Sequence, residues 1–160
     1  MRRIFFRRKR EGKTDFRARK NLLMSGKPRL VVRRTNKYMI AQIIKSDAAQ
    51  DAVIIGVNSK KLVEMGWKGS FKNIPSAYLT GILLGKKSID AGINEAVLDI
   101  GLHRSTKGSK IYAVLKGCID AGLSVAHSGD ILPSEDRISG KHINEKLASE
   151  VEKLKKKILG

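Results

Sequence analysis

Residues 29–44 read RLVVRRTNKYMIAQII, and this stretch decides the fold. Runs rich in β-branched residues occupy 29–34 and 38–44, and the polar sequence Thr35-Asn36-Lys37 separates them. This pattern predicts a β-hairpin in which Asn36 and Lys37 form a two-residue turn. A third β-rich run at 52–57 extends the hairpin to an antiparallel meander of three strands.

The turn also predicts the register of the hairpin and the roles of its two faces. Thr35 should oppose Tyr38, and Arg33 should oppose Ile40. Gln42 is the only polar side chain in the middle of the second run, so the face that it shares with Arg33 is expected to be open. The other face carries the apolar side chains that we expect to meet the helices, which are Leu30, Val32, Met39, Ala41 and Ile43.

Helical and strand patterns continue beyond the meander. Apolar residues at helical spacing predict helices at 75–92 and 110–121, with a short buried strand at 96–100 between them. The irregular segment before the first of these helices is expected to be anchored by a buried Trp67. A final helix from Ser139 onward should carry an apolar stripe formed by Ile143, Leu147, Val151, Leu154 and Ile158.

These elements predict an α+β fold with layers like those of α/β proteins. The three-stranded antiparallel meander is extended by a further strand, helices cover one sheet face, and the other face stays open. We divide the chain into a basic arm with a short helix (1–26), an α/β core domain (27–130) and a C-terminal loop with an amphipathic helix (131–160).

Composition excludes several classes of protein. The chain has 160 residues, enough for one domain, and 33 Lys and Arg against 15 Asp and Glu give it a net charge of +18. Its 41% of hydrophobic residues exclude a disordered tail, and its charge is unlike that of a neutral metabolic enzyme. Cys118 is the single cysteine and is expected as a core thiol, which predicts no disulfide framework and fits a reducing cytoplasm. The apolar runs predict neither a membrane span nor a signal peptide.

Most of the positive charge lies at the start of the chain. Residues 1–37 carry 15 Lys and Arg against two acids, whereas the rest of the chain carries 18 against 13. Because like charges repel, we expect Arg2–Lys13 to be a weakly structured arm until phosphates neutralise it, followed by a short helix from Phe16 that Asp15 caps. A solvated tail, a nuclear-import signal and a membrane-surface patch show similar charge and stay open as alternatives.

The residue types of the arm favour RNA. Arg outnumbers Lys by seven to two between Arg2 and Arg19, and the planar guanidinium group suits bidentate contacts with phosphate. Ile4, Phe5 and Phe6 interleave with this charge. They could stack against RNA or dock the arm on its own domain, and the sequence leaves both readings open.

The segment GLHRSTKGSK at 101–110 is a second candidate contact with a polyanion. It runs from the end of a predicted strand to the start of a predicted helix, and it combines two glycines and three hydroxyl groups with Arg104, Lys107 and Lys110. Free N–H groups at a helix start, next to a flexible basic loop, suit a phosphate backbone. The alternative is an ordinary exposed connection.

Other motifs do not predict chemistry. The segment GILLGKKS at 81–88 lacks both the glycine spacing and the preceding strand of a phosphate-binding loop. Zinc-site spacing is missing among the histidines, which are His103, His127 and His142. A metal-dependent nuclease is the alternative function, because three acids could converge on metal ions: Asp99, Asp120 and Asp130. We expect no metal and no cofactor, since two of these acids suit a helix end and a loop.

Six segments together resemble a known family, large-subunit ribosomal protein eighteen in its archaeal or eukaryotic form. The resemblance covers nearly the whole chain. The segments are RKREGKTDFRARK (8–20), GKPRLVVRRTNK (26–37), PSAYLTG (75–81), LDIGL (98–102), KGCIDAG (116–122) and PSEDRISGKHI (133–143).

The resemblance implies a structural protein of the cytoplasmic ribosome, with no catalysis and no membrane or DNA partner. It implies that the protein binds 5S ribosomal RNA and docks it into the central protuberance against the large ribosomal RNA. A member of the ribosomal protein-five family is the implied neighbour. The resemblance carries over the arm and the hairpin residues Arg29, Arg33, Asn36 and Lys37 as RNA contacts.

The residues and the resemblance together predict an RNA-binding surface made from the arm, the hairpin and the basic loop. A DNA-compacting protein is a third reading, which competition with duplex DNA would distinguish. The expected contacts are Arg2, Arg3, Arg7, Arg8, Lys9, Arg10, Lys13, Thr14, Arg17, Arg19, Lys20, Arg29, Arg33, Asn36, Lys37, Gln42, His103, Arg104, Ser105, Lys107, Ser109 and Lys110.

Arg33 and Arg34 are neighbours in a predicted strand, so their side chains should point to opposite faces of the sheet. Only Arg33 is then expected to meet RNA on the open face. We therefore expect Arg33→Ala to weaken RNA binding at unchanged thermal stability, and Arg34→Ala to do less to binding.

Overall fold

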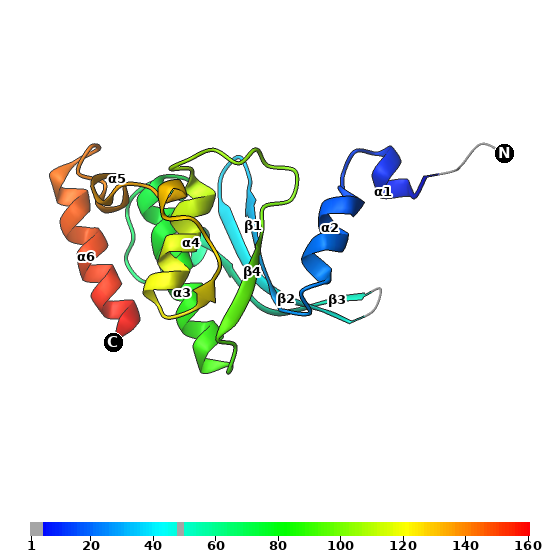
Figure 1. Cartoon of the computed structure of the whole chain (residues 1–160). Helices are drawn as coiled ribbons and strands as arrows, with labels where there is room; N and C mark the ends of the chain where they lie inside the picture. The colour runs from blue at the N-terminus through cyan, green and yellow to red at the C-terminus, as the bar shows by residue number, and fades with distance from the viewer. Residues whose placement is uncertain (1–4, 48–49) are drawn as a thin grey trace.

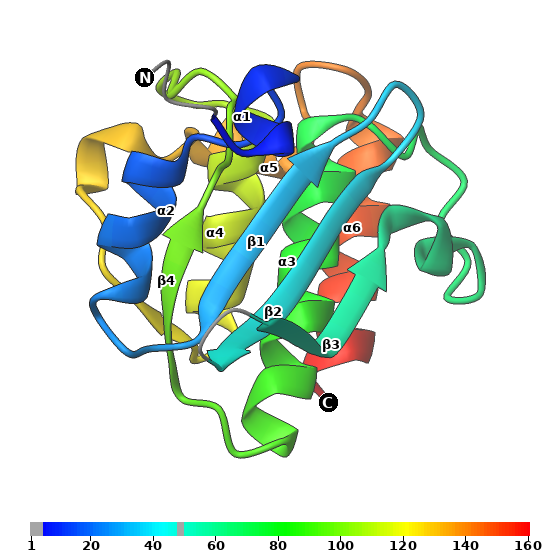
Figure 2. The same cartoon turned by 90° about the vertical axis from the view of Figure 1, so that its right-hand side faces the viewer.

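The computed structural model describes residues 5–47 and 50–160 of the chain, and in this part five strands form one sheet in the order β3-β2-β1-β4-β5 (Figures 1 and 2). The first three strands are antiparallel, and β4 and β5 continue the sheet in parallel pairing. The α+β class is therefore confirmed, with a fifth strand that the sequence did not predict. The strands are β1 (Arg29–Arg34), β2 (Met39–Asp47), β3 (Gln50–Asn58), β4 (Glu95–Asp99) and β5 (Ser124–Val125).

The register of the first hairpin is the predicted one. Arg33 pairs with Ile40, Val31 pairs with Gln42, and the backbone N–H of Thr35 donates to the carbonyl oxygen of Tyr38. The apolar set predicted for the inner face is fully buried, with Leu30, Val32, Met39, Ala41 and Ile43 all at 0% exposure.

Two long helices cover that inner face and form the core with it. They are α3 (Ile74–Asp90) and α4 (Lys110–Asp120), close to the predicted bounds, and α6 (Glu145–Leu159) packs on α3 as an outer layer (Figure 1). Asn73 caps α3 by accepting a hydrogen bond from the Ser76 N–H. Two 3₁₀ helices, η1 (Ser59–Val63) and η2 (Gly129–Ile131), lie in the connections. Trp67 is buried beyond η1 as predicted, and its indole N–H donates to the Ser70 carbonyl.

Glycines let the backbones of α3 and α4 touch. A Cβ atom on Gly81 would lie 2.1 Å from the carbonyl oxygen of Val114, and one on Gly117 would lie 2.2 Å from the carbonyl oxygen of Tyr78. Gly85 faces Ala121 in the same way, with 2.7 Å between the added Cβ and the alanine Cβ. The two glycines of GILLGKKS therefore serve helix packing. The segment lies within α3 and does not form a phosphate-binding loop.

The C-terminal segment differs from the single helix that the sequence predicts. A short helix α5 (Glu135–Ser139) ends at Gly140, whose φ of +80° lies in the left-handed region, and α6 begins only at Glu145. Ile143 therefore lies outside the helix and is 53% exposed, although the rest of its stripe packs inward.

The arm is more structured than the charge pattern predicts. It contains a short helix α1 (Arg7–Arg10) and the helix α2 (Phe16–Leu23), which begins at the predicted cap because Asp15 accepts hydrogen bonds from the Arg17 and Ala18 N–H groups. Both helices lie on the side of the sheet opposite α3 and α4, so the face expected to be open is partly covered (Figure 1). The surfaces of β2 and β3 stay uncovered on this side (Figure 2).

Within the described residues, no helix has both the length and the apolar character of a membrane span.

Candidate nucleic-acid interface

Local contacts hold the arm in a defined shape despite its charge. Glu11 accepts ion pairs from Arg7 at 3.7 Å and from Lys13 at 2.9 Å, and the Arg8 Nε donates to the Thr14 hydroxyl. These contacts offset part of the repulsion that predicted a weakly structured arm. Arg2 and Arg3, which are also expected RNA contacts, lie outside the described residues.

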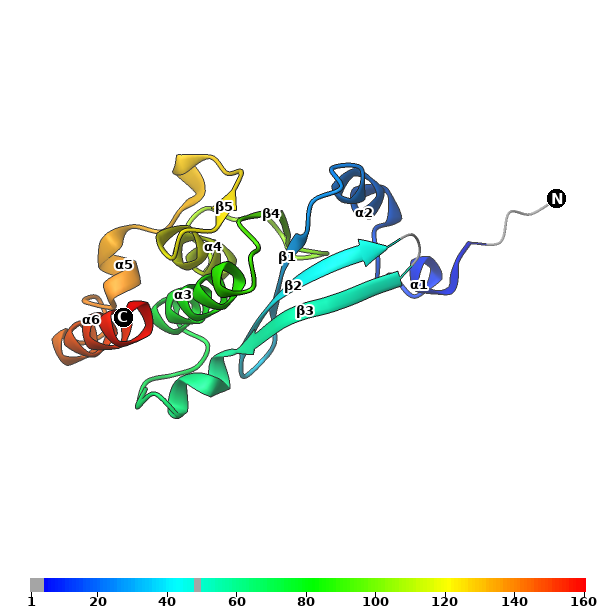
Figure 3. The same cartoon turned by 90° about the horizontal axis from the view of Figure 1, so that it is seen from below.

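A network of ion pairs ties the arm to the sheet. Arg19 on α2 donates to the Asp51 carboxylate on β3, at 2.9 Å. Arg29 on β1 contacts the same carboxylate at 2.9 Å and that of Asp99 on β4 at 2.6 Å, and it also donates to the Ser46 hydroxyl. Figure 3 shows the ends of β2 and β3 extending toward the α2 side, which places Asp51 within reach of Arg19.

Both carboxylates are held in the charged form. Burial opposes ionisation of Asp99, but the hydrogen bonds and charge of Arg33, the Gly101 amide and Arg29 outweigh it and lower the pKa of Asp99. Burial likewise opposes ionisation of Asp51, and hydrogen bonds from Arg19, Ser46 and Arg29 bring its pKa well below the usual value. Both carboxylates of the network are therefore ionised at neutral pH.

Arg29 has a structural position in place of the predicted RNA contact. The residue is only 2% exposed, and carboxylates or hydroxyls satisfy both of its terminal nitrogens. A buried, neutralised guanidinium cannot reach a phosphate in this conformation. Nothing in the sequence indicates this burial, because the partner Asp99 lies 70 positions away along the chain.

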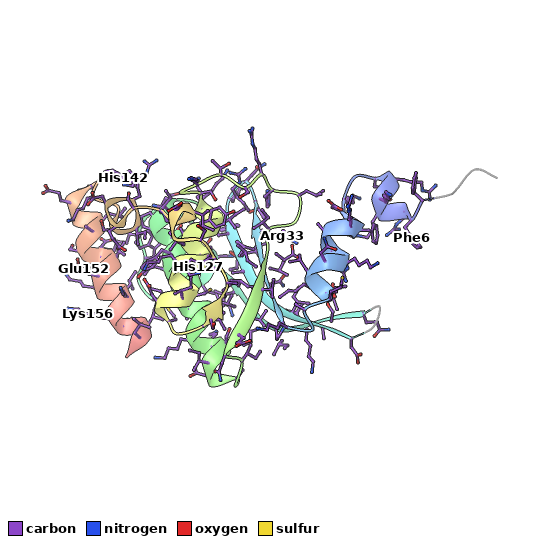
Figure 4. The ribbon with its side chains drawn as sticks, in the orientation of Figure 1. Phe6, Arg33, His127, His142, Glu152 and Lys156 are labelled. Atoms are coloured by element: carbon purple, nitrogen blue, oxygen red, sulfur yellow. The ribbon has the colours of Figure 1, made fainter. Side chains whose placement is uncertain are left out.

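The Arg33 side chain is bonded to Asp99 and is still 36% exposed. Its Nη1 donates to the Asp99 carbonyl oxygen at 2.7 Å, and its Nη2 donates to the Asp99 carboxylate at 2.9 Å. It lies on the α2 side of the sheet (Figure 4), the face predicted for it. Gly101, at φ +62°, passes so close that an added Cβ would lie 2.8 Å from the guanidinium carbon.

These contacts revise the expected effect of Arg33→Ala. The variant should lose stability, by about 1.5–3 kcal/mol for the charged hydrogen bonds that it removes, instead of leaving stability unchanged. Arg34→Ala should change stability by less than about 0.5 kcal/mol, because the Arg34 side chain is exposed and the bond to His103 comes from the backbone N–H, which the substitution keeps. Urea titration of the two variants measures the difference, and equal stabilities would contradict the Arg33–Asp99 contact.

A cleft of about 800 Å³ opens between the arm and the sheet. Arg8, Lys13 and Arg19 line it from the arm, Arg33 lines it from the sheet, and the chain from Asp99 to His103 closes one side. The structure thus brings together the arm, the first hairpin and the start of the basic loop.

A second group of cations lies at the other end of that loop. Burial, and then the charges of Lys72 and Arg34, lower the pKa of Lys110 at the start of α4, so both cations lie within electrostatic range of Lys110. His103 links this group to the cleft, because its Nε2 accepts the Arg34 N–H at 3.3 Å. Burial and then Arg34 and Arg33 lower the pKa of His103, so the imidazole is neutral at pH 7. Lys72 was missed by the sequence analysis, since it lies in an irregular segment with no motif.

The remaining predicted residues are distributed around these two groups. Ser105 is engaged with the Tyr112 hydroxyl, and Ser109 lies at the N-cap of α4 without a side-chain capping bond. Gln42 is partly buried on the α2 face of β2. Exposed positions are held by Lys9, Arg10, Arg17, Lys20, Asn36, Lys37, Arg104 and Lys107.

The acids and histidines do not assemble a reaction centre in the described part of the chain. Asp99 is neutralised by arginines, Asp120 accepts from Tyr78 and Lys116, and Asp130 is exposed in η2. No group of three or more potential metal ligands occurs among residues 5–47 and 50–160. Cys118 is buried between α3 and α4, where burial raises the pKa of its thiol to about 12.

Comparison with known proteins matches this sequence to ribosomal proteins. Residues 2–94 and 90–128 match the family described as ribosomal large subunit proteins 60S L5, and 50S L18. The large ribosomal subunit protein uL18 of Methanococcus maripaludis is 52% identical over 141 residues, which cover 88% of this chain and 73% of that protein.

Proposed function

Because the chain belongs to the family of the ribosomal large-subunit proteins 60S L5 and 50S L18, we propose that it binds 5S ribosomal RNA and attaches it to the large ribosomal RNA. Membership makes the chain a structural constituent of the large ribosomal subunit and places it in the ribosome. Proteins of this family are structural and not enzymes, so the nuclease alternative is wrong. The central protuberance is the proposed location, beside a member of the protein-five family.

The observation that carries the proposal is a surface of cations that no acid neutralises. Within the described residues, ion pairs to carboxylates do not reach Arg8, Arg10, Arg17 and Lys20 of the arm. The same holds for the group formed by Arg34, Lys72 and Lys110. Uncompensated cations repel one another, and a phosphate backbone is a polyanion that removes this repulsion.

The two groups of cations support a bridging role. The arm lines the cleft, and the group around Lys110 lies outside it, beyond His103, so one RNA can follow the arm while a second segment contacts the loop. We assign the arm (1–26) to phosphate binding and the core (27–130) to orientation. The C-terminal part (131–160) lies at the opposite end of the molecule from the arm (Figure 1) and is left outside the RNA surface.

Affinity for 5S ribosomal RNA should depend steeply on salt. If binding neutralises roughly 6–10 phosphates, raising the salt concentration from 50 to 200 mM should weaken it by about 10³–10⁵-fold, because binding releases counterions from the RNA and added salt opposes that release. Filter binding of a 5S transcript across this range measures the slope, with transfer RNA and duplex DNA as competitors. Salt-independent binding, or equal competition by duplex DNA, would contradict the proposal.

A matched pair of double variants locates the contact. Arg8→Ala with Arg10→Ala should reduce the salt slope by about 1–2, since each phosphate contact contributes nearly one unit. Lys153→Ala with Lys156→Ala removes the same charge from exposed positions of α6 and should leave the slope unchanged. Equal effects of the two pairs would mean that net charge, and not the arm, determines binding.

A further inference from the structure

Two aromatic side chains of the arm, Phe5 and Phe6, are exposed to solvent. Phe5 is 50% exposed and Phe6 is 76% exposed, just before α1. Neither ring belongs to the hydrophobic core cluster or to the residues packed against it. Large aromatic side chains normally gain free energy by burial, so exposed rings beside a binding surface indicate contact with a partner.

The contacts of these rings decide between the two readings that the sequence leaves open. Among the described residues, the aromatic ring that the Phe6 ring contacts is that of Phe16 of α2, with 5.5 Å between ring centroids and an angle of 39° between planes. The Lys9 ammonium lies 4.1 Å from the centre of the Phe5 ring. The rings therefore do not dock the arm on the core, and Figure 4 places Phe6 at the end of the molecule opposite Glu152 and Lys156.

We propose that the exposed face of Phe6 stacks on an unpaired base of the RNA that the arm binds. This inference rests on the proposed function and deepens it, because phosphate contacts alone do not distinguish paired from unpaired RNA. Aromatic side chains recognise bases that are splayed out of a helix, and every base offers a flat face to the ring.

The positive charge around Phe6 favours RNA, and not an apolar protein surface, as the partner of the exposed ring. Four cations follow it directly at 7–10, and the nearby acid Glu11 is engaged by Arg7 and Lys13. An apolar protein surface would have to desolvate these cations, whereas a nucleotide brings a phosphate for them together with a base for the ring. The Phe6 ring already packs on Phe16 of α2, and stacking on a base does not require Phe6 to lose this contact.

The test compares three variants in 5S transcript binding at several salt concentrations. Phe6→Leu removes the aromatic face and keeps the apolar volume, so affinity should fall by about 5- to 150-fold at every salt concentration while the salt slope stays unchanged. Phe6→Trp should bind at least as tightly as the unmodified chain. Ile143→Ala, an exposed apolar residue far from the arm, should bind like the unmodified chain.

A second probe separates this inference from the proposed function. Phe6→Leu should lose affinity for an unstructured oligouridine and keep its affinity for a fully paired RNA duplex, whichever natural RNA the protein prefers. Binding of Phe6→Leu within about twofold of the unmodified chain on both the 5S transcript and oligouridine would overturn the stacking contact, as would an equal loss in Phe6→Trp. Equal affinity of the unmodified chain for 5S and transfer RNA would instead overturn only the proposed function.

Discussion

Gly81→Ala is expected to destabilise the protein severely, and Gly117→Ala is expected to do the same. Each added methyl group would lie 2.1–2.2 Å from a backbone carbonyl oxygen of the facing helix. A backbone atom cannot turn aside as a side chain can, so α3 and α4 must separate and the core between them must loosen. We expect a loss at or above the upper end of the roughly 1–3 kcal/mol that overpacking costs.

Thermal melting measures this loss as a shift of roughly 2–4 °C per kcal/mol for a protein of this size. Gly129→Ala is the matched control, because Gly129 has no atom within 4 Å of an added Cβ and should tolerate the change within about 0.5 kcal/mol. Alanine is a better helix former than glycine. Stabilisation by Gly81→Ala would therefore show that the two backbones do not touch.

Asp99→Asn is the second substitution with a large expected effect. It leaves the guanidinium of Arg29 buried with only Asp51 as a charged partner, and it weakens the bond to Arg33. Breaking a buried ion pair by removing one partner costs roughly 3–5 kcal/mol, and we expect the lower end because Asp51 remains. Urea unfolding measures the loss, and Asp130→Asn in the exposed η2 should change stability by less than about 0.5 kcal/mol.

The same network predicts acid sensitivity. The folded-state pKa of Asp99 lies below the 3.8 of an unperturbed aspartate, so the stability that it contributes is present above about pH 4 and is lost as the pH falls through the folded-state pKa. Asp51 acts in the same direction. Asp99→Asn should therefore show a flatter loss of stability between pH 5 and pH 2 than the unmodified chain, and parallel curves would contradict the network.

Sequence signals predicted those features of the fold that contacts between residues close together in the chain determine. The turn at Asn36-Lys37 determined the hairpin register, and the side chain of Asp15 determined where α2 begins. The strand β5 has two residues, too few to show a period. The later start of α6 was missed because Ile143 stands four residues before Leu147, at helical spacing, although it lies outside the helix.

The candidate site was less predictable, because its decisive contacts join distant residues. The family resemblance carried over Arg29 as an RNA contact, and only the fold brings Asp99 beside it. Lys72 has no motif of its own and joins Arg34 and Lys110 only through the packing of α3, α4 and β1. The placement of α2 over the sheet likewise involves a long-range pair, Arg19 with Asp51.

The most direct test of the central claim is crosslinking of the protein to total cellular RNA, followed by sequencing of the bound species. The account predicts that 5S ribosomal RNA and one segment of the large ribosomal RNA dominate the bound fraction, and that peptides from the arm carry the crosslinks. Crosslinks spread over unrelated RNAs in proportion to their abundance, or found mainly on α6, would contradict it.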